Sequence, residues 1–251
     1  MNKEFKKALS NTARQLNMRE KEVFAEIIKL SVFSIFAHFD KPMNAQYDLI
    51  HADISFIGFD FQMPAPKLLA LAELQSLLHV QMKAAEPFSD VITEFYNSEF
   101  ISQKNKSGQF MTPMSLADKL LPFLFEDTFD GESSFCEPTC GTGTLALSTL
   151  KAIYNKHGKH GLVDKTLVLN DIDPTVLRIA LYQVMFHSFH HNAPLKCIDI
   201  KCSDLINEYL SKDAQTVLVC KIKEPMEREL ALMKALAFHF SNDSNGLSIE
   251  I

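Results

Sequence analysis

The sequence predicts an α/β protein in which a helical N-terminal region precedes a parallel sheet. Three observations lead to this prediction. Apolar residues recur at three- and four-residue spacing through most of residues 1–100, as in amphipathic helices. After residue 110, short apolar runs alternate with helix-like stretches, which is the pattern of βαβ units. A turn with two glycines, EPTCGTG at residues 137–143, joins the first of these runs to the helix that follows it.

The N-terminal region is expected to be a helical domain that ends at residue 101. Pro66 stands near the start of the third predicted helix, where its missing N–H is tolerated, and Pro87 interrupts the chain after that helix. Ser89 or Asp90 is expected to cap the next helix. Only residues 54–61, ISFIGFDF, alternate as a strand would, and that segment suits a loop as well. The predicted helices cover residues 1–15, 20–39, 65–86 and 88–101.

A polar segment, SQKNKSGQ at residues 102–109, separates this region from a second unit that runs to residue 251. Strands that are joined by helices usually run parallel, so we expect a parallel sheet whose strand ends meet along one edge. The predicted strands cover residues 133–138, 165–173, 195–204 and 214–222. The predicted helices cover residues 142–157, 174–191 and 225–240.

Composition and charge limit the class of protein. The chain of 251 residues is 47% hydrophobic and 22% charged, as globular proteins are, and its formal net charge is −6. This charge argues against a general basic surface that coats nucleic acid, although a local basic cleft stays open. Residues 1–17 are charged, unlike a signal peptide, and no apolar run reaches the roughly 18 residues of a transmembrane helix. We therefore expect a cytoplasmic protein without membrane contact.

Neither the cysteines nor the histidines form a strong metal signature. The five cysteines are odd in number and lack CxxC spacing, so we interpret them as reduced, mostly buried thiols. A zinc site from Cys136, Cys140, Cys197 and Cys202 stays an alternative, although structural zinc sites favour closer ligand pairs. The segment FHSFHHN at residues 186–192 ends a predicted helix, where histidine interacts favourably with the helix dipole. We prefer that interpretation to a metal site.

The glycine turn and the acids at the strand ends suggest a nucleoside ligand. Glycines at a strand-to-helix junction let a ligand approach backbone N–H groups at a helix N-terminus. Asp171 lies at the tip of the second predicted strand, where a carboxylate can accept hydrogen bonds from two ribose hydroxyls. Asp204 has the matching place at the tip of the third strand and suits an adenine amino group. Such acids also cap helices, as Asp173 and Asp204 can here, and spacing alone leaves both interpretations open.

Three motifs resemble successive signatures of the gamma-class adenine DNA methyltransferases. They are GQFMTP at 108–113, EPTCGTGTLAL at 137–147 and LNDIDPTVLRIA at 169–180. The closest likeness is to the modification subunits of type I restriction systems and their plasmid- and phage-borne relatives, and it covers about residues 94–204. The resemblance implies a Rossmann-like S-adenosylmethionine-dependent methyltransferase sheet, preceded by an all-helical N-terminal domain. Few residues follow the fourth predicted strand, so this sheet is expected to be incomplete and the methyltransferase-like domain truncated.

The resemblance also implies roles for individual residues in binding S-adenosyl-L-methionine. The methionine side of the site would be lined by Gln109, Phe110, Thr112 and Pro113. The turn around the cofactor would consist of Glu137, Pro138, Cys140, Gly141 and Gly143. Glu137 stands where the family usually has Asp, and its carboxylate can still accept from the cofactor's ammonium group. Asp171 would bind the ribose, with Ile172 against the adenine, and Asp204, by a looser match, would meet the adenine amino group.

The motif that presents the target base is missing. In the family an Asn/Asp-Pro-Pro-aromatic motif follows the fourth strand, where it accepts hydrogen bonds from the adenine amino group and stacks on the flipped base. This sequence contains no Asn-Pro-Pro or Asp-Pro-Pro, and its fourth predicted strand continues into KIKEP at residues 221–225. No catalytic residue is therefore assigned. We expect a protein whose methyl transfer, on its own, is impaired or absent.

Alternative roles follow from these features. One is an adenine-specific DNA methyltransferase, or its cofactor-binding part, with DNA as the partner. Another is a non-catalytic anti-restriction or regulatory decoy that binds restriction–modification subunits. A third is a decayed gene fragment without a role. The sequence indicates neither an oligomeric state nor a DNA target.

Overall fold

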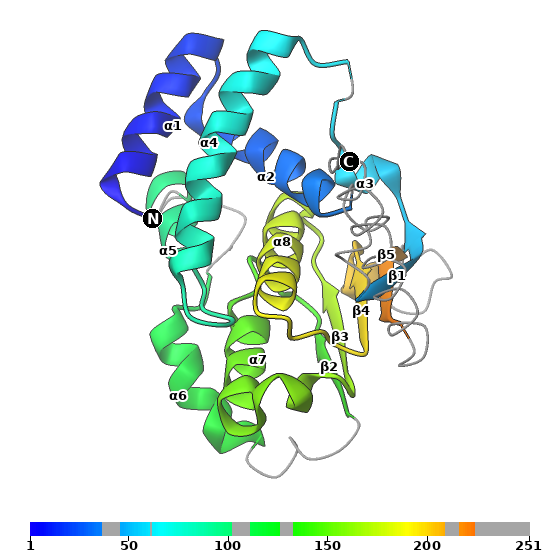
Figure 1. Ribbon diagram of the computed structural model, residues 1–251. Helices are drawn as coiled ribbons and strands as arrows, with labels where there is room; N and C mark the ends of the chain where they lie inside the picture. The colour runs from blue at the N-terminus through cyan, green and yellow to red at the C-terminus, as the bar shows by residue number, and fades with distance from the viewer. Residues whose placement is uncertain (37–45, 61, 102–110, 126–132, 209–215, 224–251) are drawn as a thin grey trace, which may run out of the picture.

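The computed structural model describes residues 1–36, 46–60, 62–101, 111–125, 133–208 and 216–223 (Figure 1). Within them a five-stranded sheet has the order β1-β5-β4-β3-β2. Its parallel part consists of β2 (Ser133–Glu137), β3 (Lys165–Asn170) and β4 (Cys197–Lys201). Its antiparallel part consists of β5 (Thr216–Ile222), which pairs with β4, and β1 (Tyr47–Ala52), which pairs with β5. This mixed sheet confirms the α/β class.

The N-terminal helices are α1 (Lys3–Leu16), α2 (Glu20–Phe36), α3 (Ile54–Ile57), α4 (Ala65–Ala84) and α5 (Thr93–Phe100). Of these, α1, α2 and α4 lie at one end of the molecule, whereas α3 lies near β1 and β5 of the sheet (Figure 1). α1 begins where the Asn2 side chain accepts the N–H of Phe5, and it ends at Asn17 in the left-handed conformation. The predicted helices at 1–15, at the described part of 20–39, and at 65–86 are thereby confirmed.

The second group of helices comprises α6 (Met114–Phe125), α7 (Thr144–His157), η2 (Gly158–Leu162), α8 (Pro174–His190) and α9 (Leu205–Glu208). Of these, α7 and α8 confirm the predicted helices at 142–157 and 174–191. α7 ends at Gly158, as predicted, and α8 begins with Pro174 after the Asp173 side chain accepts the N–H of Thr175 at 2.8 Å. The capping interpretation of Asp173 is therefore confirmed.

The N-terminal helices and the sheet layer share one hydrophobic core. α2 packs against α8, and buried residues from both regions form one contiguous cluster. Near α5, Phe24 contacts Phe95 and Phe100, with ring centroids 5.4 and 5.2 Å apart. The boundary at residue 101 stays a prediction, because the polar segment 102–109 lies outside the described residues, as does the predicted helix 225–240.

Three details of the N-terminal region differ from the prediction. Residues 54–57, for which a strand and a loop were both left open, form helix α3. The strand of this region is β1, at 47–52, and only Tyr47 in it is buried, so its residues do not alternate as those of a half-buried strand do. α5 begins at Thr93 rather than near residue 88, because the Asp90 side chain accepts the N–H groups of Ile92 and Thr93 in a turn before the helix.

The expected parallel direction of the last strand was also wrong. β5 runs antiparallel to β4, with Lys201 opposite Thr216 and Cys197 opposite Lys221. The residue after β5 therefore lies at the amino end of β4, at the opposite edge of the sheet from the loops that follow β2, β3 and β4. A doubly wound sheet returns its fourth strand to the free side of its first. Within the described part of the chain, the hydrogen-bonded neighbour of β2 is β3 alone.

Candidate functional site

The glycine turn follows β2 and is shaped by two left-handed residues. Gly141 has φ 53° and Gly143 has φ 92°, conformations that side chains with a Cβ rarely adopt. The N–H of Gly143 donates to the carbonyl of Cys140 at 2.8 Å, and Gly143 then serves as the N-cap of α7. A Cβ on Gly143 would lie 3.0 Å from the Cβ of Ala180, so glycine also lets α7 approach α8. Both glycines are buried.

Asp171 lies directly against this turn. One oxygen of its carboxylate, Oδ2, accepts the N–H of Gly141 at 2.8 Å, and the other, Oδ1, accepts the N–H of Asp173 at 2.9 Å. The structure thus brings together the turn and the acid that the sequence singled out separately. Each carboxylate oxygen has a second lone pair, so Asp171 retains the capacity to accept from a ligand hydroxyl.

Asn170 holds the same loops together and was missed by the sequence analysis. Its side-chain N–H groups donate to the carbonyls of Pro138 and Ser203, at 3.0 and 3.1 Å, and its Oδ1 accepts from the Ser203 hydroxyl. Its own carbonyl accepts the N–H of Cys140 at 2.8 Å. This buried amide therefore fixes the positions of the loops after β2 and β4 relative to β3. The sequence feature that could have indicated this role is an amide side chain at the end of the apolar run LVLN.

Glu137 ends β2 with a carboxyl group that is protonated more readily than usual. Its Oε2 accepts the N–H of Ala146 in the first turn of α7 at 3.1 Å. Burial and the nearby Asp171 raise the pKa of Glu137 to about 8, although the Ala146 hydrogen bond opposes this shift. Burial, Glu137 and Asp171 likewise raise the pKa of the Cys140 thiol. The Glu137 carboxyl group and the Cys140 thiol therefore become negatively charged only at a higher pH than usual.

The motif at residues 108–113 approaches the turn through Met111. A Cβ built on Gly141 would lie 2.6 Å from the Sδ atom of Met111, so this side chain covers the glycine. Met111 and Thr112 are half-buried, and Pro113 is exposed just before α6. The predicted site residues Gln109 and Phe110 lie outside the described residues.

The two residues assigned to the adenine lie at the ends of neighbouring strands. Ile172 is 64% exposed beyond the end of β3, and its role toward adenine stays a prediction. Asp204 caps α9: its Oδ1 accepts the N–H groups of Ile206 and Asn207, and its Oδ2 accepts from the Asn207 side chain. These bonds lower the pKa of Asp204. The structure thus supports the capping interpretation for Asp204, and its role toward adenine stays a prediction.

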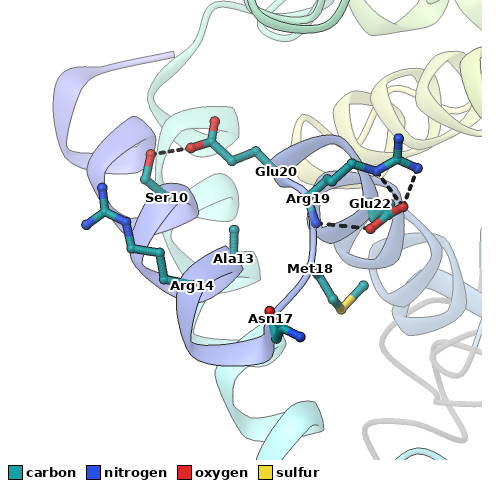
Figure 2. A pocket seen from close by; sticks show the side chains of 8 residues that line it. All are labelled: Ser10, Ala13, Arg14, Asn17, Met18, Arg19, Glu20 and Glu22. Carbon is teal, nitrogen blue, oxygen red and sulfur yellow. Dashed lines mark hydrogen bonds and ion pairs between the residues drawn. The ribbon is translucent and has the colours of Figure 1, made fainter.

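A hollow of about 580 Å³ lies between the end of α1 and the start of α2 (Figure 2). The Ser10 hydroxyl donates to Glu20 across it, and Arg19 forms an ion pair with Glu22. No residue of the glycine turn, and no strand-end acid, lines it. It therefore does not belong to the predicted site.

Of the three histidines at the end of α8, only His187 is buried. The ring of His187 is buried; its Nε2 donates to the carbonyl of Ser89 at 2.9 Å. Burial lowers the pKa of His187 to about 4. Among the described residues no group of three His, Cys, Asp or Glu side chains could hold a metal ion. In the same part of the chain no helix is long and apolar enough to cross a membrane.

Comparison with known proteins decides the family. Residues 84–220, more than half of the chain, match the N-6 DNA Methylase family model. The chain belongs to this family. This membership confirms the resemblance to adenine DNA methyltransferases, and members of the N-6 DNA methylases generally use S-adenosylmethionine.

One curated relative is similar to part of the chain. The Type II methyltransferase M.VspI of Vibrio sp. (strain 343) is 28% identical over 108 residues, which are 43% of this chain and 24% of that protein. The match thus spans about a quarter of the relative's length. No solved structure matches the chain.

Proposed function

We propose that this N-6 DNA methylase family chain binds S-adenosylmethionine between the glycine turn at 137–143 and Asp171. The observation that carries the proposal is the 2.8 Å hydrogen bond from the Gly141 N–H to Asp171 Oδ2. It joins two motifs separated by thirty residues, at the carboxyl ends of two parallel strands. Nucleotide ligands bind in α/β sheets at such strand ends, beside the N-terminus of a helix.

The carboxylate acceptors beside the turn suit a cationic nucleoside. The half-buried Glu137 carboxyl group lies 3.1 Å from the Ala146 N–H, and no cation among the described residues pairs with it. The cofactor's positive charge would stabilise the ionised form of this group, and its ribose hydroxyls would donate to Asp171. Ile172 offers an exposed apolar side chain to the adenine ring. Bound there, S-adenosylmethionine would supply an activated methyl group.

We further propose that the chain does not methylate adenine in DNA on its own. The sequence lacks the Asn/Asp-Pro-Pro-aromatic motif, and β5 ends with Lys221 and Ile222 and is followed by Lys223. β5 places these residues opposite Cys197, at the amino end of β4. At about 3.3 Å per residue, the length of β4 separates them from the loop that holds Asp204 by roughly 15 Å. A base presented after β5 would therefore lie far from the methyl donor.

A methyl-transfer experiment tests both parts. The purified protein is incubated with S-adenosyl-[methyl-³H]methionine and unmethylated DNA. We expect tritium to be retained with the protein on a filter and to be absent from acid-insoluble DNA. Sequence-dependent tritium in the DNA would overturn the proposal of inactivity, and absence of retained label would overturn the proposal of cofactor binding.

The same missing motif favours a second role, that of a non-catalytic partner of restriction–modification subunits. A chain that keeps the fold of the N-6 DNA methylases without a means to present a base could occupy a subunit's place in such a complex. Co-purification with a complete restriction–modification complex would support this role. Binding to DNA alone, without binding to the complex, would contradict it.

A further inference from the structure

The loop between α4 and α5, residues 85–92, also contacts the glycine turn and the start of α7. Asp90 in this loop accepts the Thr144 hydroxyl with Oδ2 at 2.6 Å. At the start of α5, the hydroxyls of Thr93 and Thr142 share a hydrogen bond of 2.6 Å. Thr142 belongs to the turn and Thr144 is the first residue of α7. The N-terminal region therefore contributes hydrogen bonds directly to the predicted cofactor site.

One buried amide fastens these parts together. Gln183 of α8 has no exposed surface, and its Oε1 accepts the N–H groups of Val91 and Ile92 at 3.0 and 3.2 Å. Its Nε2 donates to the carbonyl of Thr142 at 3.1 Å and to Asp90 Oδ1 at 3.3 Å. A side-chain amide has two donors and one doubly accepting oxygen, so Gln183 uses its whole capacity here. The loop, the turn and α8 are joined by this one side chain.

The loop itself is anchored to the same helices. Phe88 is fully buried, with φ 55°, and its ring lies 6.0 Å from Tyr154 of α7 and 5.8 Å from His187 of α8. Ser89 accepts a hydrogen bond from His187 at 2.9 Å. The family match begins at residue 84, just before this loop, rather than at residue 102. The loop therefore belongs with the part of the chain that is shared by the N-6 DNA methylases.

We propose that Gln183 and Asp90 are positioning residues of the cofactor site: they hold Thr142 and Thr144, and hence the glycine turn, in the shape that accepts the nucleoside. Buried polar groups that are fully paired select one conformation, because breaking any pair leaves a desolvated partner. The inference rests on the proposed binding of S-adenosylmethionine. It makes residues 85–93 part of the site, although they precede the predicted boundary at residue 101.

The test replaces Gln183 by a side chain of similar size without hydrogen bonds. Gln183→Met is compared with Gln75→Met, because Gln75 is also a buried helical amide and donates to Ser31 and Ser34, at 3.2 and 3.1 Å, between α4 and α2. Both variants are expected to melt at a lower temperature. Only Gln183→Met is expected to weaken S-adenosylmethionine binding, by roughly tenfold or more in calorimetry. Equal affinity in both variants would overturn the proposal.

Asp90 is tested by rescue. Asp90→Ala removes the acceptors for Ile92, Thr93 and Thr144, whereas Asp90→Asn keeps Oδ1 and can donate to the Thr144 hydroxyl. We expect the alanine variant to weaken cofactor binding and the asparagine variant to restore most of it. If the asparagine variant binds as weakly as the alanine variant, hydrogen bonding by Asp90 is not what positions the turn.

A measurement without cofactor separates this inference from the proposed function. Amide hydrogen exchange of peptides spanning residues 138–147 should be faster in Gln183→Met than in Gln75→Met, since the N–H groups of Cys140, Gly141 and Gly143 are all bonded within the site. If the wild-type protein binds no S-adenosylmethionine, the proposed function fails while this exchange result still decides the positioning role. Unchanged exchange in the turn would overturn it.

Discussion

The carboxylate of Asp171 accepts a hydrogen bond from the backbone N–H of Gly141 at 2.8 Å, across the ends of β3 and β2. This contact gives the acid a dual role. It stabilises the left-handed turn and leaves a further lone pair on each carboxylate oxygen, which the proposed contact with the ribose requires. A variant of Asp171 therefore affects both the turn and the binding of the ligand, and it needs a control at a carboxylate that only caps a helix.

Replacement of Asp171 by asparagine should weaken S-adenosylmethionine binding by about tenfold or more, because the amide removes the charge and one of the acceptors. The matched control is Asp173→Asn, two residues away. Asp173 accepts the N–H of Thr175 as the N-cap of α8, and asparagine caps helices about as well as aspartate. Calorimetry should find near-normal affinity in the control; equal losses in both variants would argue against a specific role of Asp171.

Substitution of Gly141 by alanine should abolish cofactor binding. The alanine would have to adopt a backbone φ of 53°, and its Cβ would lie 2.6 Å from Met111 Sδ. The turn or the Met111 side chain must therefore move. Gly158→Ala is the control, because it introduces backbone strain of about 1–3 kcal/mol where a Cβ meets nothing within 4 Å. Thermal melts should show both variants destabilised. Retained affinity in Gly141→Ala would exclude the turn as the binding site.

The stability of the protein should fall as pH rises from about 4.5 to 8 through the contribution of Glu137. Its pKa in the folded protein is raised to about 8 from an ordinary value near 4.5, so in this window the folded state holds a proton that the unfolded state has lost. Glu137→Gln should therefore flatten the dependence of the unfolding free energy on pH. Denaturant titrations at a series of pH values measure this; identical slopes in both proteins would contradict it.

Cofactor binding should release protons for the same reason. A cation beside Glu137 favours its ionised form, so wild-type affinity should increase between pH 6 and pH 8.5. Calorimetric titrations in buffers of different ionisation enthalpy count the protons released. S-adenosylmethionine itself titrates, so the number of protons released by the wild-type protein is compared with the number released by Glu137→Gln. The variant should release fewer protons. Equal release by the two proteins would remove Glu137 from the site.

The strand β1 should contribute to stability without contributing to binding. The buried hydroxyl of Tyr47 accepts the N–H of Leu195 at 2.6 Å and shares a hydrogen bond with Ser188 of α8 at 2.8 Å. Tyr47→Phe removes the acceptor of the buried Leu195 N–H, whereas Ser188 keeps its bond to the Ala193 carbonyl, and should lower the unfolding free energy by about 1–3 kcal/mol. Cofactor affinity should not change. Unchanged stability would show that β1 does not occupy its place in the sheet.

The parallel part of the sheet could be predicted because its signals are local. The apolar runs before Glu137 and Asn170, the glycines of the turn and the proline that starts α8 each fix a conformation over a few residues. The proximity of Gly141 and Asp171 then follows, because the carboxyl ends of parallel strands meet at one edge.

The direction of β5 and the pairing of β1 could not be predicted in this way. Residues 202–215, between β4 and β5, are enough in number for either a crossover or an antiparallel return, so chain length does not decide the direction. β1 is largely exposed and therefore lacks an alternating pattern. Asn170 and Gln183 escaped notice because their importance depends on partners far away in the sequence: residues 138 and 203 for the first, and residues 90–92 and 142 for the second.

Photochemical cross-linking tests the central claim most directly, because it shows where the cofactor lies. S-adenosyl-[methyl-³H]methionine is irradiated with the wild-type protein, and the labelled peptides are identified by mass spectrometry. Label in the peptides that contain residues 137–143 or 171–172, with loss of label in Asp171→Asn, is the predicted result. Label at the hollow between α1 and α2 would contradict the proposed site. So would the absence of any label that an excess of unlabelled cofactor displaces.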